Sequence, residues 1–177
     1  MAKLMNITEY LNSLDGWMQY WAFEKKELQE GLDVDRLFYR GRVEGSKFGK
    51  VDVYAFVKHV PDNIDGNWAR TYSANLMEYA SRIRTGPPLG FGAMLVVHPV
   101  MIVENISNEL YNWVMNYCPK HFAAAEFPSI LNLSSGDIYY YPKTPVWGAL
   151  YYNGYRTQTQ QFFSPKKWTE ISSAIPR

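Results

Sequence analysis

Cysteine is almost absent from this chain, which has Cys118 as its only thiol among 177 residues. One thiol excludes a disulfide within the chain and a metal site built from several cysteines. Histidine is scarce as well: there are three, far apart and in no His-x-x-x-His pattern, so we predict no metal site. A chain of this length buries roughly 70% of the surface it exposes when unfolded, and we expect it to fold without disulfide, metal or cofactor.

Long apolar runs are lacking too. The longest, at 91–103, is shorter than the roughly 20 residues of a membrane-spanning helix, and His98 and Pro99 interrupt it. The first ten residues turn polar early and contain no apolar core of a signal peptide. We therefore expect a cytoplasmic protein that does not enter a membrane, folded as one domain over 1–177.

A strong net charge is also missing, since the chain carries a formal charge of only +1. Such a chain has no overall field that would draw it onto nucleic acid or anionic lipid. The charge is unevenly distributed, however. Residues 138–177 contain five basic residues and one acidic residue, whereas 1–137 contain 13 basic and 16 acidic residues.

Complete catalytic motifs are not found. The glycine-rich segment 86–92 precedes a predicted strand, contains two prolines without N–H donors, and lacks the Lys-Ser/Thr of a P-loop. Cys118 and His121 are the components of a thiol nucleophile. Cys118 follows an apolar helical stripe, however, where a cysteine is usually buried and inert. We predict a structural turn at 86–92 and a structural role for Cys118.

Three helices are predicted in the first two thirds of the chain. Asn6 and Glu9 have the spacing of a capping box, and an apolar stripe with helical spacing follows over 7–21. A second helix is expected at 68–84, where prolines end it. Ser107 is a suitable N-cap for a third helix.

The first strands are predicted from alternation of apolar and polar residues. The segments 36–44 and 50–58 alternate and flank a glycine-containing turn, which predicts an antiparallel hairpin. The segment 93–103 is apolar along its length and is expected to be a central strand buried on both faces.

The last third predicts a meander of four antiparallel strands in 129–163, followed by a short helix from about Pro165. Turn residues separate short aromatic segments, and Asn153-Gly154 is the strongest signal for a two-residue hairpin. The predicted fold class is α+β: a mostly antiparallel sheet with helices packed on it, in the order α-β-β-α-β-α-β-β-β-β-α.

Aromatic residues are abundant, and "IYYYPKTPVWGALYYNGYR" at 138–156 holds seven Tyr or Trp, two basic residues and no acid. As strands, this segment would bury one face and present aromatics on the other, where an ordinary exposed face is polar. Trp147 and Tyr151 would share a face. The candidate ligand- or partner-binding residues are Tyr139, Tyr141, Lys143, Trp147, Tyr151 and Arg156.

These residues predict a non-catalytic binding or sensor-like interaction module that contacts its partner through the aromatic meander. Exposed apolar patches usually mark contact with a partner, so we expect self-association into a homo-oligomer, or binding of another protein; a small ligand is also possible. The first alternative is binding of single-stranded nucleic acid, because bases stack on aromatic rings and Lys and Arg meet phosphates. Lys143 and Arg156 are few cations for that function.

The second alternative is a metal-dependent hydrolase or nuclease that uses Glu44, Asp52 and Lys58. Carboxylates and a lysine on adjacent strands hold Mg²⁺ in nucleases of the restriction-endonuclease type. The sequence lacks the Glu-x-Lys expected on the next strand. A helix also follows the first two strands, where a run of three strands is expected.

Overall fold

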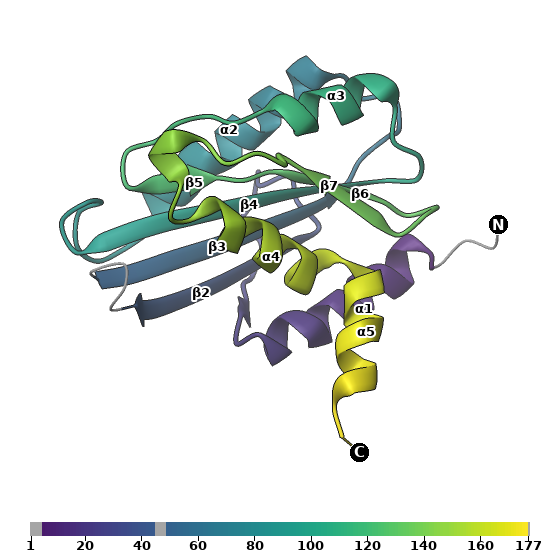
Figure 1. Cartoon of the computed structure of the whole chain (residues 1–177), viewed down its shortest axis with the longest axis horizontal. Coiled ribbons are helices and arrows are strands. Elements are labelled where there is room, and N and C mark those ends of the chain that lie inside the picture. The colour runs from purple at the N-terminus through teal and green to yellow at the C-terminus, as the bar shows by residue number, and fades with distance from the viewer. Residues whose placement is uncertain (1–4, 45–48, 177) are drawn as a thin grey trace.

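The computed structural model describes residues 5–44 and 49–176 and consists of a seven-stranded sheet between two layers of helices (Figure 1). The turn of the predicted first hairpin, 45–48, lies outside the described residues. The order across the sheet is β1-β2-β3-β4-β6-β7, and β5 pairs with β4. The strands are β1 (Glu24–Lys25), β2 (Arg36–Glu44), β3 (Gly49–His59), β4 (Ala93–Val103), β5 (Ala124–Glu126), β6 (Ser129–Asn132) and β7 (Asp137–Tyr140).

The helices divide between the two faces of the sheet. On one face, α2 and α3 pack against the side chains of β3, β4 and β6; on the other, α1, α4 and α5 form a second layer (Figure 1). A 3₁₀ turn, η2, precedes α4. The helical elements are α1 (Ile7–Tyr20), α2 (Gly66–Ile83), α3 (Asn108–Asn116), η2 (Val146–Gly148), α4 (Tyr152–Phe163) and α5 (Pro165–Ala174).

The α+β class is confirmed, but the prediction of a mostly antiparallel sheet is wrong because the sheet is mixed. β3, β4 and β6 run parallel to one another, and β4 is also parallel to β5. The antiparallel pairs are β1 with β2, β2 with β3, and β6 with β7. The reason is that α2 and α3 act as crossover connections, which return the chain to the same end of the sheet before the next strand begins.

The predicted helix starts are confirmed in atomic detail. The Oδ1 atom of Asn6 accepts a hydrogen bond from the N–H of Glu9, and the Glu9 carboxylate accepts one from the N–H of Asn6, both at 2.9 Å. Ser107 Oγ accepts a hydrogen bond from the N–H of Leu110 at 3.1 Å. These contacts satisfy N–H groups that have no partner within the helix.

The prediction of a four-stranded C-terminal meander is wrong. β6 and β7 form the hairpin expected around 133–136, but no strand follows β7 in the described chain, and Asn153 and Gly154 lie in the first turn of α4. Residues of this helix are buried at spacings of three and four, which places them on the sheet, whereas Asn153 and Gly154 face solvent. Burial of this apolar stripe overrides the local preference for a turn.

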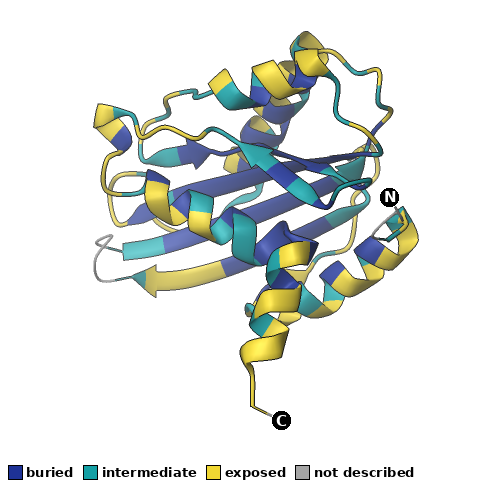
Figure 2. Cartoon of the chain, turned by 45° about the vertical axis from the view of Figure 1, so that its right-hand side comes forward, coloured by how far each residue is buried: buried dark blue, intermediate teal, exposed yellow. Residues whose placement is uncertain are grey.

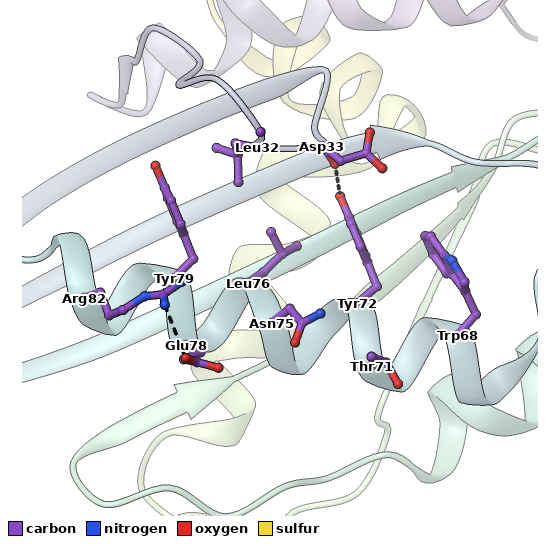
Figure 3. Close-up of a pocket in the computed structure, with 11 residues that line it drawn as sticks. Leu32, Asp33, Trp68, Thr71, Tyr72, Asn75, Leu76, Glu78, Tyr79 and Arg82 are labelled. Carbon is purple, nitrogen blue, oxygen red and sulfur yellow. Dashed lines mark hydrogen bonds and ion pairs between the residues drawn. The ribbon is translucent and has the colours of Figure 1, made fainter.

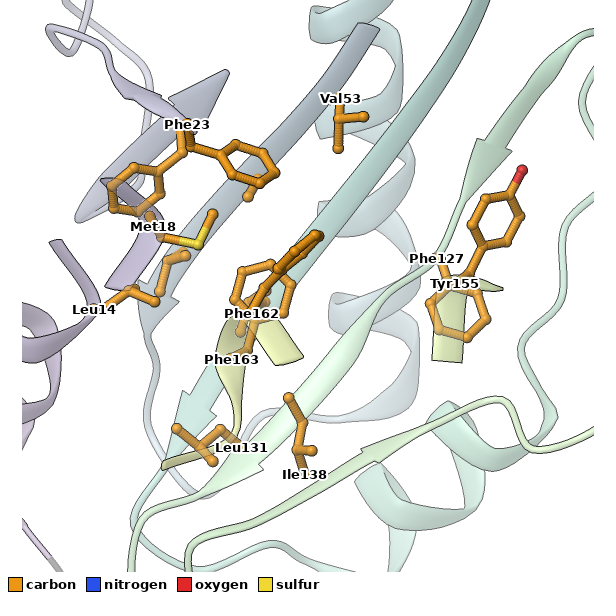
Figure 4. Packing of buried hydrophobic residues seen from close by; sticks show 14 of the residues in the cluster. Leu14, Met18, Phe23, Val53, Phe127, Leu131, Ile138, Tyr155, Phe162 and Phe163 are labelled. Carbon is orange, nitrogen blue, oxygen red and sulfur yellow. The ribbon is translucent and has the colours of Figure 1, made fainter. Parts of the chain in front are cut away.

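Aromatic residues of α4 occupy the centre of the core on its side of the sheet. Figure 4 shows Phe162 and Phe163 beside Leu14 and Met18 of α1, and all four side chains are at most 1% exposed. The central strands are buried along most of their length, and exposure is concentrated in loops and outer helix faces (Figure 2).

The strand directions place the loops at two opposite ends of the sheet. Because β3, β4 and β6 are parallel, the segments that precede these strands lie at one end, here called the amino end, on the left in Figure 1. Because β7 is antiparallel to β6, the segment that follows β7 returns to the amino end. The amino-end loops are 84–92, 117–123 and 141–151; the carboxyl-end loops are 60–65, 104–107 and 133–136.

Candidate interaction surface

Large apolar side chains are exposed together at the amino end, on all three of its loops. Five such residues, Phe91, Phe122, Val146, Trp147 and Leu150, together with the loops that carry them, are called the end surface. Their exposed fractions are 95% for Val146, 86% for Leu150, 77% for Phe91, 75% for Phe122 and 41% for Trp147. Apolar side chains exposed singly are common, but a group drawn from three loops is not.

Contacts between the loops hold the end surface together. Phe122 lies against Gly90, so closely that a side chain at Gly90 would overlap its ring. Cys118, at the start of the second loop, donates a hydrogen bond to the hydroxyl of Tyr152 at 3.4 Å. The first loop therefore packs on the second, and the second is joined to the start of α4.

The third loop is shaped by its proline, glycine and arginine. The N–H of Gly148 bonds to the carbonyl of Pro145 at 2.9 Å and closes the η2 turn. Gly148 is buried under the ring of Tyr152, where a Cβ would collide with that ring. Arg156 donates to the carbonyl of Lys143 at 2.7 Å and to Thr144 Oγ1 at 2.8 Å. This clamp fixes the loop against α4.

Tyr152 forms the buried floor beneath the third loop. Trp147, Tyr141 and Phe127 each meet it edge-on, with ring centroids 5.4, 6.2 and 5.8 Å away. Burial, and then the hydrogen bond from Cys118, raises the pKa of Tyr152, so it stays a neutral phenol. The floor is therefore apolar and uncharged at neutral pH.

Five of the six candidate residues lie on or beside the end surface: Tyr141, Lys143, Trp147, Tyr151 and Arg156. Tyr139 does not, because β7 turns its side chain toward α3, where its ring lies 5.3 Å from that of Tyr111. The expectation that Trp147 and Tyr151 share a strand face is wrong, since η2 and the start of α4 replace the strand. Tyr151 instead stacks on Tyr155 at 6.5 Å.

Charge is separated between the two ends of the sheet. The described amino-end loops 84–92, 117–123 and 141–151 contain three basic residues and no Asp or Glu: Arg84, Lys120 and Lys143. Arg84 is paired with Asp52, and Glu44 ends β2 at this end of the sheet. The carboxyl-end loops 60–65, 104–107 and 133–136 contain three acidic residues and no Lys or Arg: Asp62, Asp65 and Glu104. Asp137, which follows the last of these loops, is paired with Lys166. The end surface therefore combines exposed apolar rings with positive charge.

Phe91, Phe122, Lys120 and Leu150 were not among the residues singled out from the sequence. Phe91 had been counted in the apolar run that forms β4. It lies between Gly90 and Gly92, which both have positive φ values of 81° and 94°. An aromatic residue between two glycines is a signal for an exposed turn rather than a strand, and it could have identified this position.

The three residues of the hydrolase hypothesis are not brought together. Asp52 and Lys58 share the α2 face of β3 but are six residues apart, which is roughly 20 Å along a strand. Lys58 is paired with Asp33 near the carboxyl end. Glu44 lies on the face of the sheet that α4 covers. Burial raises the pKa of Tyr155 there, and the charges of Tyr151 and Glu44 raise it further.

Asp52 is part of a different cluster, which includes two cations. Its side chain is 1% exposed and lies 2.7 Å from the hydroxyl of Tyr39, 3.0 Å from Lys50 Nζ and 3.4 Å from Arg84 Nη2. The hydrogen bond to Asp52 raises the pKa of Lys50. Burial raises the pKa of Tyr39, and the hydrogen bond to Asp52 raises it further. As predicted, α2 follows the β2–β3 hairpin; the two-residue strand β1, which was not predicted, precedes it.

Cys118 and His121 also have separate partners. His121 Nε2 lies 2.8 Å from the buried carboxylate of Glu126, which in addition accepts hydrogen bonds from Ser73 Oγ at 2.6 Å and Tyr117 at 2.8 Å. Cys118 bonds to Tyr152 instead. Glu126 thus ties α2 and the second amino-end loop to β5.

The glycine-rich loop 86–92 uses its own N–H groups. The N–H of Gly90 bonds to Ala93 and that of Phe91 to Pro88, at 2.9 and 3.0 Å. Both groups are therefore engaged inside the turn. Across residues 5–44 and 49–176, no three His, Cys, Asp or Glu side chains are grouped so that they could hold a metal ion. No helix of that part is long and apolar enough to cross a membrane.

Two hollows that share Tyr79 lie along α2 and are alternative sites. One hollow of about 540 Å³ lies between α2 and the segment 31–33, where Tyr72 donates to the carbonyl of Asp33 at 2.7 Å (Figure 3). A second hollow of about 690 Å³ contains Tyr39 and Tyr54. The bond from Tyr79 to Gln29, 3.0 Å long, spans from α2 to the segment that forms the opposite wall. These walls bond to each other across the hollows, whereas the rings of the end surface project into solvent.

Comparison of the chain with models of protein families, with curated proteins and with solved structures found no match. No residue pattern of a known family can therefore be transferred to this chain. The chemistry of the end surface carries the functional argument.

Proposed function

We propose that this protein is a non-catalytic binding domain that contacts a macromolecular partner through the end surface. The observation that carries the proposal is the group of four apolar side chains, each at least 75% exposed, at the tips of three loops. Contiguous apolar patches on a protein surface mark contact sites more often than not.

The energetics favour this location. Covering a large apolar side chain contributes about 1.5–3 kcal/mol, so a partner that covers four of them gains enough to offset much of the cost of association. The clamp of Arg156 on Lys143 and Thr144 holds the third loop before any partner arrives. Such preorganisation lowers the entropy lost on binding.

The test replaces Val146 and Leu150 by serine together, because both are so exposed that folding stability should change little. The matched control replaces Leu28 and Ile175 by serine; these are exposed apolar residues elsewhere, at 45% and 47%. Association is measured with two probes: the chain itself, by sedimentation equilibrium, and a fluorescent single-stranded oligonucleotide, by anisotropy.

We expect at least one probe to associate with the unmodified chain and with the control, and to lose association with the Val146→Ser/Leu150→Ser variant. Midpoints of chemical unfolding should agree among the three proteins. If neither probe associates, or if the double variant associates as the parent does, the end surface is not the contact site and the proposal is wrong.

A hydrolase is the second candidate, favoured by one observation: Asp52 and Lys50 lie two residues apart on one face of β3 and form an ion pair. A carboxylate and a lysine so placed could serve a Mg²⁺-bound phosphate. Incubation of the chain with labelled single- and double-stranded DNA and Mg²⁺ tests it. Cleavage that disappears in Asp52→Asn while circular dichroism shows that the variant is still folded supports this candidate, and intact DNA in the parent reaction removes it.

A further inference from the structure

We infer that the partner of the end surface is a single-stranded nucleic acid, an inference that depends on the proposed function and narrows it to one class of partner. From the sequence alone, only Lys143 and Arg156 were candidates for contact with the phosphate groups of a nucleic acid. The fold adds cations and rings from segments far apart in the chain, and it does so at one end.

The positive charge of the end surface is available to a partner. Lys120 and Lys143 are exposed, and within residues 5–44 and 49–176 neither forms an ion pair with an acidic side chain. Arg42 is exposed at the end of β2, on the same end of the sheet. Cations spaced along a rim attract a phosphate backbone without reading its sequence.

The exposed rings provide the second half of single-strand recognition. Phe91, Phe122 and Trp147 present ring faces or edges to solvent, and unpaired bases stack on such rings. In a duplex the base faces are already stacked on one another. A surface that contributes rings between cations therefore favours single strands over duplexes.

The charges argue against the other occupants. In a dimer built around a two-fold axis the end surface would face a second end surface, so two basic surfaces would meet, which like charges disfavour. An acidic peptide would satisfy the cations but supplies no regular series of flat rings for Phe91, Phe122 and Trp147. Asp62, Asp65 and Glu104 in the carboxyl-end loops disfavour the approach of phosphate there, where Lys58 and Lys166 are paired with Asp33 and Asp137.

The experiment measures the anisotropy of a fluorescent oligothymidine of roughly 12 nucleotides, a length within the range of single-strand sites. If about three phosphates are neutralised, affinity should fall about 18-fold between roughly 50 and 200 mM salt. Lys120→Gln and Lys143→Gln should each reduce this salt dependence, whereas Lys166→Gln, near the carboxyl end, should not change it.

The rings are tested separately. Trp147→Ala and Phe122→Ala should each weaken binding about tenfold, while Tyr20→Ala, which removes an exposed ring on α1, should have no effect. Unfolding midpoints within error of the parent would exclude a loss of folding as the cause.

Each failure has a distinct meaning. If the chain self-associates through Val146 and Leu150 but does not bind the oligonucleotide, this inference is wrong while the binding domain stands. The same holds if a duplex or a polyglutamate peptide binds as tightly as the single strand. If nothing binds and the chain stays monomeric, both proposals fail.

Discussion

His98 shows how a single polar residue can be placed in an apolar core. It lies in β4, fully buried, with its ring 5.7–6.3 Å from those of Phe127, Phe162 and Phe163. Burial, and then the charge of Arg40, lowers its pKa from 6.5 to about 3. The folded protein therefore holds this histidine neutral, while the unfolded chain protonates it below about pH 6.5.

This difference predicts that the free energy of unfolding decreases as the pH is lowered. The folded-state pKa is below the unfolded value, so the contribution is complete above pH 6.5 and is lost as the pH falls toward 3. We expect the free energy of unfolding to drop by up to about 1.4 kcal/mol per pH unit from roughly pH 6 downward. Urea unfolding between pH 7 and 5 measures this slope.

His98→Leu should flatten that slope, because the substituted side chain binds no proton in either state. An equal slope in the parent and in His98→Leu would show that His98 does not account for the pH dependence.

Asp52 makes the second prediction at this scale. Asp52→Asn removes the negative charge between Lys50 and Arg84, whose guanidinium is 9% exposed. Loss of one partner of a buried ion pair costs about 3–5 kcal/mol, because the other charge stays buried. The matched change Asp137→Asn, in an exposed pair with Lys166, should cost less than about 1 kcal/mol. Similar losses for both variants, measured by urea unfolding, would contradict this assignment.

At the scale of elements, helices with a capping signal could be predicted from the sequence, and α4 could not. Asn6 and Ser107 identify their helices because the cap is a local hydrogen bond. The N-terminus of α4 has no side-chain cap, and Asn153-Gly154 is a local signal for a turn. Only the sheet below it, formed by distant strands, selects the helical spacing of its buried residues.

The end surface was predictable in part for the same reason. Tyr141, Lys143, Trp147, Tyr151 and Arg156 are close in sequence, so they were found together even though the strand interpretation was wrong. Phe91, Phe122 and Lys120 reach this surface only because α2 and α3 are crossovers that return the chain to the amino end. The spacing of apolar residues in a strand or a helix does not show to which end of the sheet the chain returns.

Two phenylalanines test the division of roles between the core and the end surface. Phe163 of α4 is fully buried, and Phe163→Ala should cost about 3–5 kcal/mol of unfolding free energy. Phe122 is 75% exposed, and Phe122→Ala should cost less than about 0.5 kcal/mol. A large loss for Phe122→Ala in urea unfolding would mean that this ring supports the fold rather than a contact.

At the scale of the whole molecule, both helical layers pack on the same strands, and this predicts one cooperative unfolding transition for residues 1–177. Leu14→Ala, in the α1 layer, and Leu76→Ala, in the α2 layer, remove side chains that are at most 4% exposed. Each should cost about 2–5 kcal/mol and shift the entire transition, by fluorescence and circular dichroism alike. Separate transitions for the two variants would show that the layers unfold independently.

The separation of charge between the two ends has a consequence for the way this nearly neutral protein approaches a partner. With a net charge of +1, its attraction to a polyanion at long range is weak. Basic loops at one end and acidic loops at the other nevertheless form an electric dipole along the strands. Within a Debye length of about 8–10 Å, the field of a polyanion exerts a torque on this dipole. A polyanion would therefore turn the amino end toward itself before contact.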